Sequence, residues 1–142
     1  LTHACSPVTD GLMPYREADL LRNILDRADA ALKEGKNQAT LRFGHESCLL
    51  PLVALLELNH YGESYPDVEK LSEQWRAYDI FPMASNVQFV FFHKKGSNDV
   101  LVKVLLNEKE TKLPVKTDVA PYYHWKDVES YYREKLDKYQ HM

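Results

Sequence analysis

The feature that most constrains this chain is the run from Cys48 to Leu56, in which every side chain is apolar. A helix that is apolar on all sides cannot face water and must be buried between other elements. The run therefore predicts a buried helix with structure packed on both flanks. Pro51 fits this helix if it lies in the first turn, where backbone amides have no intrahelical partner.

Helical patterns precede and follow this run. Over residues 14–32, leucine, isoleucine and alanine recur at spacings of three and four, which predicts an amphipathic helix that ends at Gly35. Residues 68–78 show a shorter pattern of the same kind, with Tyr78 expected on its apolar side. Residues 125–139 carry an aromatic and leucine stripe, which predicts a last amphipathic helix.

Strand patterns occur in three places. Residues 38–43 are short and contain β-branched and aromatic side chains, which favour a strand. Residues 87–93 and 100–106 are rich in Val, Phe and Leu and flank a turn at Gly96, so they predict a β-hairpin. Residues 113–115 are expected to add a short extension to the sheet.

This order of elements predicts an α/β fold in which helices cover a small sheet of about three strands. We expect residues 1–142 to form a single domain, because a chain of this size can bury about two-thirds of its unfolded surface. A net charge of -3 excludes a broadly basic surface for nucleic acid. No apolar stretch approaches the roughly 18 residues of a membrane span, so we expect no membrane partner either.

Cysteines and histidines indicate no metal site or cofactor. Cys5 and Cys48 do not make a disulfide framework; Cys48 is interpreted as a small buried hydrophobe, and Cys5 as free or paired outside the chain. His3 lies two residues from Cys5, but no second ligand pair follows at metal spacing. Surface or structural roles are expected for His60, His93, His124 and His141. Packing, and not base stacking, is expected for Tyr122, Tyr123, Trp125, Tyr131 and Tyr132.

The segment with chemical potential precedes the apolar run and reads Leu-Arg-Phe-Gly-His-Glu-Ser over residues 41–47. A strand is expected to end here, and ligands of α/β sheets bind beyond strand ends. A helix start also favours an anion such as phosphate. His45 could donate hydrogen bonds to phosphate oxygens, and Glu46 could protonate a departing alkoxide. The alternative is that Glu46 or Ser47 caps the helix, with His45 packed beneath.

Three blocks of sequence resemble the multiple inositol polyphosphate phosphatases, a phytase-like clade of the histidine acid phosphatases (branch 2 of the histidine phosphatase superfamily). The first block, residues 41–46 followed by Leu49-Leu50-Pro51-Leu52, resembles their second active-site motif. The others are Pro82-x-Ala84-Ser85-Asn86, and Val104-Leu105-Leu106-Asn107-Glu108 followed by Leu113-Pro114. They stand in the family's order between residues 39 and 114.

The resemblance implies a function for the chain. His45 would bind the phosphate being transferred, and Glu46 would be the proton donor of a metal-independent phosphomonoesterase acting on inositol polyphosphates. Many members of the clade read His-Ala-Glu and most other histidine acid phosphatases read His-Asp, whereas this chain reads His-Glu-Ser. The resemblance also implies a secreted, periplasmic or lumenal location.

The family's nucleophile is a histidine in an amino-terminal Arg-His-Gly-x-Arg-x-Pro motif, and no Arg-His-Gly occurs here. We therefore expect the carboxyl-terminal part of a phosphoglycerate-mutase-like α/β sandwich, inactive without its amino-terminal part as partner. Since the chain begins at Leu1, not methionine, a processed product or an excised piece is expected.

Two alternatives stay open. The chain could be a non-catalytic anion-binding or interaction module of the same fold, in which an open sheet edge favours self-association. It could also belong to a related phosphatase that acts on other phosphomonoesters.

Overall fold

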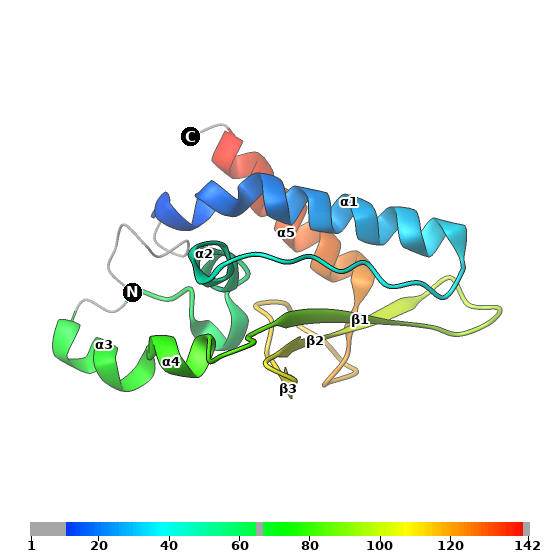
Figure 1. Cartoon of the computed structure of the whole chain (residues 1–142). Coiled ribbons are helices and arrows are strands. Elements are labelled where there is room, and N and C mark those ends of the chain that lie inside the picture. The colour runs from blue at the N-terminus through cyan, green and yellow to red at the C-terminus, as the bar shows by residue number, and fades with distance from the viewer. Residues whose placement is uncertain (1–10, 65–66, 141–142) are drawn as a thin grey trace.

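Two long helices lie on one side of a small sheet, and a short buried helix stands beside them (Figure 1). The structure is a computed structural model that describes residues 11–64 and 67–140. Helices α1 (Ala18–Glu34) and α5 (Trp125–Gln140) form the helical layer. The core lies between these two helices, α2 (Glu46–Leu55) and strand β2. This arrangement confirms the α/β class.

The first helix forms as its apolar spacing predicts. A 3₁₀ turn, η3 (Met13–Glu17), leads directly into α1, and α2 packs against this turn. Leu21 and Leu25, one turn apart, are fully buried. Gly35 ends the helix with a φ of 65°, a left-handed conformation that glycine adopts without steric cost.

The sheet is built around the predicted hairpin. Strands β1 (Val87–His93) and β2 (Val100–Leu106) pair antiparallel along their whole length. Two short strands, β3 (Lys109–Glu110) and β4 (Tyr123–His124), also pair with β2. Alternate β2 residues are buried, so one face of the sheet contributes to the core: these are Val102, Val104 and Leu106.

The last helix carries the predicted stripe, with Trp125, Val128, Tyr132 and Leu136 buried. Tyr123 is buried as well, which confirms packing as the role of Tyr123, Trp125 and Tyr132. Arg133 on α5 joins the two long helices, because its guanidinium donates to Asp26 and Asp29 of α1, each at 2.9 Å. Charge-assisted bonds of this kind fix the orientation of one helix against the other.

Three predicted elements differ from the structure. Residues 113–115 form no strand; the sheet is extended by β3 after a two-residue turn instead. The helix expected over 68–78 is divided into α3 (Val68–Gln74) and α4 (Ala77–Ile80). The break occurs at Trp75, where the backbone is extended and the indole Nε1 donates to the Tyr61 carbonyl at 3.1 Å. Tyr78, expected on an apolar side, is 67% exposed.

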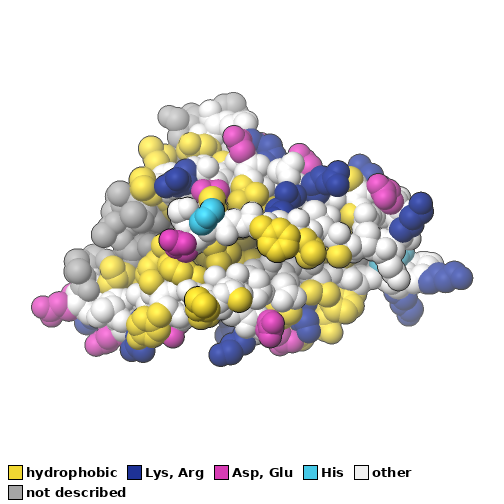
Figure 2. All heavy atoms as spheres, viewed as in Figure 1, with side chains coloured by type: hydrophobic (Ala, Val, Ile, Leu, Met, Phe, Trp, Pro, Cys, Tyr) yellow, Lys and Arg dark blue, Asp and Glu magenta, His cyan; other side chains and the backbone are white. Residues whose placement is uncertain are grey.

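The third difference concerns residues 38–43, which were expected to form a strand. They belong to a stretch that runs back from the end of α1 to the start of α2 without regular secondary structure (Figure 1). A strand requires a partner for its backbone, and the described part of the chain places none beside it. Leu41 and Phe43 are 77% and 94% exposed, and apolar side chains gather on this face of the molecule (Figure 2).

Candidate active site

His45 and Glu46 lie at the beginning of α2. His45 is the N-cap residue, with an extended backbone (φ -115°, ψ 167°), and its carbonyl accepts the amides of Cys48 and Leu49. Its side chain makes no capping hydrogen bond, and both His45 and Glu46 are exposed. The alternative in which His45 is packed beneath a cap is therefore wrong.

Helix α2 changes from exposed to buried along its length. Glu46 and Ser47 are exposed, residues 48–50 are half-buried, and residues 52–55 are buried. The beginning of the helix therefore faces solvent while its other end lies in the core. The amides of Glu46 and Ser47 precede the first intrahelical hydrogen bond and can bind an anion, with a carboxylic acid beside them.

Two other residues of this helix differ from expectation. Because α2 begins at Glu46 and not at Cys48, Pro51 lies in the helix interior and not in its first turn. A proline there removes the amide that would otherwise donate to the Ser47 carbonyl. Cys48 is a free, half-buried thiol, while Cys5, His3 and His141 lie outside the described residues.

The second and third blocks of sequence that resemble the family contact each other through Asn86 and Asn107. The Asn107 amide donates to the Asn86 carbonyl at 2.8 Å, and the Asn107 side-chain oxygen accepts the Asn86 amide at 3.0 Å. The Asn107 Nδ2 donates to the Ile80 carbonyl at 2.7 Å. Asn107 and Glu108 both have positive φ, as a two-residue hairpin turn requires. These blocks hold the sheet to α4.

A largely buried polar cluster that no sequence pattern indicated lies at the other end of α2. We call it the Glu57 cluster: Glu57, Tyr131 and Lys135. The Lys135 ammonium lies 2.8 Å from the Glu57 carboxylate, and the Tyr131 hydroxyl donates to that carboxylate at 2.5 Å. Burial lowers the pKa of Lys135, and the Glu57 carboxylate opposes this shift. Burial and the bond to Glu57 raise the pKa of Tyr131.

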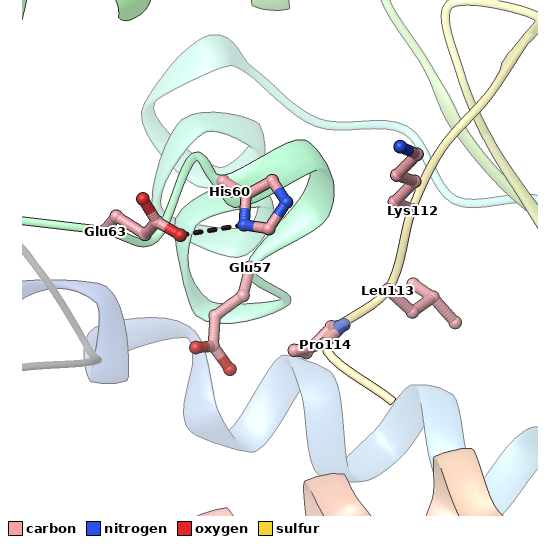
Figure 3. A pocket seen from close by; sticks show the side chains of 6 residues that line it. All are labelled: Glu57, His60, Glu63, Lys112, Leu113 and Pro114. Atoms are coloured by element: carbon pink, nitrogen blue, oxygen red, sulfur yellow. Dashed lines mark hydrogen bonds and ion pairs between the residues drawn. The ribbon is translucent and has the colours of Figure 1, made fainter. Parts of the chain in front are cut away.

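A small cavity of about 170 Å³ adjoins this cluster (Figure 3). Its lining includes Glu57 and His60 on one side and Leu113 on the other. His60 pairs with Glu63 at 2.7 Å, as the dashed line in Figure 3 shows. Within the described residues, no group of three or more acidic, histidine or cysteine side chains is arranged to hold a metal ion.

His124 is clamped between two carboxylates. Its Nδ1 lies 3.1 Å from Asp99, next to the hairpin turn, and its Nε2 lies 2.8 Å from Asp118 in the loop before β4. A neutral imidazole has one N–H and can donate to one carboxylate, whereas the protonated ring can donate to both. The hydrogen bonds to Asp118 and Asp99 accordingly raise the pKa of His124.

The clamp predicts how stability depends on pH. Because the folded pKa of His124 lies above its ordinary value of 6.5, its contribution is complete below that value and is lost as pH rises through the folded pKa. We expect urea unfolding of the chain to show a larger loss of stability as pH rises above 6.5 than unfolding of His124→Gln. Equal losses in both proteins would contradict the clamp.

Comparison with known proteins identifies the family of this chain. The family model of branch 2 of the histidine phosphatase superfamily matches residues 16–107, more than half of the chain and including the His45–Glu46 pair. The chain belongs to this family. One similar protein is Multiple inositol polyphosphate phosphatase 1 from Homo sapiens, which is 28% identical to this chain over 134 residues. The match covers 85% of this chain and 27% of the relative, so the chain spans about a quarter of that protein's length.

The described helices of this family member include none that is both long and apolar enough to cross a membrane.

Proposed function

We infer that this chain is the carboxyl-terminal portion of a phosphomonoesterase that hydrolyses inositol polyphosphates through a phosphohistidine intermediate. The observation that carries the inference is the exposed His45–Glu46 pair at the open start of a helix whose other end is buried, in a histidine phosphatase chain. The name of the human relative supports the substrate class.

The proposed reaction has two steps. A histidine in the amino-terminal part attacks phosphorus, and the bond to the inositol oxygen breaks while Glu46 transfers its proton to that oxygen. Water then attacks the phosphohistidine, Glu46 takes a proton from the water, and the histidine and inorganic phosphate are released. His45 donates hydrogen bonds to the phosphoryl oxygens, whose charge the amides at the start of α2 also stabilise.

The remainder of the protein is the proposed partner of the exposed stretch before α2. Residues 38–43 of this stretch are exposed, and the Phe43 side chain is 94% exposed. This exposure agrees with a strand whose neighbour is not among the described residues. An unpaired strand with apolar side chains favours pairing with another chain, so the piece alone is expected to self-associate. By family resemblance we place the whole protein in a secreted, periplasmic or lumenal compartment.

Phosphate release tests this function. We expect the purified chain to release no phosphate from inositol hexakisphosphate, because it has no Arg-His-Gly nucleophile, and the full-length protein to be active. A panel of other phosphomonoesters should be hydrolysed more slowly by the full-length protein. Activity of the chain alone would contradict the split site. A full-length protein inactive on every phosphomonoester would indicate the binding module, and a preference for another ester would indicate the related phosphatase.

A further inference from the structure

The buried end of α2 is held by donors from α5. The Lys135 ammonium donates to the Leu55 carbonyl at 2.6 Å, and the Tyr132 hydroxyl donates to the Leu56 carbonyl at 2.8 Å. These carbonyls belong to the last turn of a helix, where no intrahelical amide reaches them. A cation at this end of a helix also complements the helix dipole. One face of α5 thus supplies both partners that the end of α2 needs.

The next residue along the chain, Glu57, is fixed by the same face. Its backbone has a φ of 54°, and its carboxylate accepts from Lys135 and from Tyr131. The side chains of Lys135 and Glu57 are only 11% and 12% exposed. Removing one member of a buried ion pair leaves the other charge without its counter-charge, which is strongly unfavourable. Lys135 therefore bonds both to the last turn of α2 and to the residue that follows it.

These contacts at the buried end of α2 affect the position of His45 and Glu46 because α2 is a short rigid helix. Ten residues span about 15 Å, so a tilt of about 5° at the anchored end moves the first turn by about 1 Å. Glu46 and Ser47 are exposed, whereas Leu49 and Leu50 already pack against the core. The direction of α2, and with it the position of the first turn, follows from this packing together with the hydrogen bonds at the buried end. Misplacement of a reacting group by about 1 Å can lower a rate about a hundredfold.

We propose that the Glu57 cluster is a positioning group for the Glu46 proton donor, with Lys135 as its central member. Lys135 touches neither substrate nor the reacting atoms; it acts through the orientation of α2. The proposal rests on the function inferred above, because it assumes that Glu46 protonates the leaving oxygen.

The test compares two substrates in the full-length protein. Inositol hexakisphosphate has an alkoxide leaving group that needs a proton, whereas dinitrophenyl phosphate releases a stable anion that does not. We expect Lys135→Met to lower kcat/KM for inositol hexakisphosphate by about tenfold to a hundredfold and for dinitrophenyl phosphate by less than about threefold. Lys135→Arg, which keeps a cation and donors, should restore most of the loss.

The matched control is Lys138→Met on the same helix. Lys138 is 73% exposed and pairs with Glu134, so this variant should leave kcat/KM for both substrates unchanged. Tyr131→Phe removes one hydroxyl from the cluster and should give the same selective loss of activity at smaller amplitude. This variant keeps the test available if Lys135→Met does not fold. Equal losses on the two substrates in Tyr131→Phe or Lys135→Met would overturn the positioning role.

Glu46→Gln, measured in parallel, separates the two proposals. If Glu46→Gln loses activity selectively on inositol hexakisphosphate while the cluster variants lose it uniformly, only the positioning role is wrong. If Glu46→Gln itself shows no selectivity, Glu46 is not the proton donor and both proposals fail.

Discussion

Glu46→Gln in the full-length protein is expected to lower kcat/KM for inositol hexakisphosphate by about 10²-fold to 10⁴-fold, the usual contribution of a general acid. Glutamine has the shape of glutamate but cannot transfer its proton to the leaving oxygen. Because Glu46 is exposed, the substitution should leave the fold intact. Loss of a negative charge from the first turn of a helix costs about 0.3–1 kcal/mol, too little to unfold the protein.

Phosphate release measured under steady-state conditions checks this expectation. Glu34→Gln is the control, because Glu34 is an exposed glutamate at the end of α1. It should retain the activity of the unmodified protein. If Glu46→Gln stayed within about twofold of that activity, Glu46 would have no part in the proton transfer.

Leu55→Ala is expected to lower the free energy of unfolding of the chain by about 2–5 kcal/mol, because it leaves a cavity in a packed core. Leu55 is fully buried in the half of α2 that lies against the core. A domain of this size has a total stability of about 5–15 kcal/mol, so the loss is a large share of it. Urea unfolding followed by circular dichroism measures it.

Phe43→Ala is the matched comparison, and its expected cost differs between the chain alone and the full-length protein. In the chain alone, kept dilute enough to be monomeric, Phe43 is 94% exposed and the change should stay within about 0.5 kcal/mol. In the full-length protein it should cost about 3–5 kcal/mol, because the proposed amino-terminal part buries the ring. A neutral effect in both proteins would argue against the proposed contact, and a small effect of Leu55→Ala would contradict the described core.

Local patterns predicted the parts of the fold that depend on neighbouring residues in the sequence. The stripe over residues 14–32 became η3 and α1, the Gly96 turn joined two paired strands, and the aromatic stripe became α5. Each of these signals depends on spacing within one element, which fixes the face that is buried. The His45–Glu46 pair was also visible in sequence, because it directly precedes an apolar run.

Other features depend on partners that a local pattern does not specify. Residues 38–43 have the composition of a strand, but a strand also needs a neighbour for its backbone. At the break, Trp75 donates a hydrogen bond to the distant Tyr61, and the α2 start at Glu46 places Pro51 in the helix interior. Composition alone favours a strand or helix in each case, and the tertiary contacts decide the outcome.

What the sequence by itself determined is the α/β class, the two long helices, the hairpin and the position of His45 and Glu46 before a buried helix. What only the tertiary structure decided is which distant charges meet. Glu57 and Lys135 are 78 positions apart, and His124 and Asp99 are 25 apart. Both pairs form because packing brings separate elements together, and for Glu57 and Lys135 burial then requires each charge to have a partner.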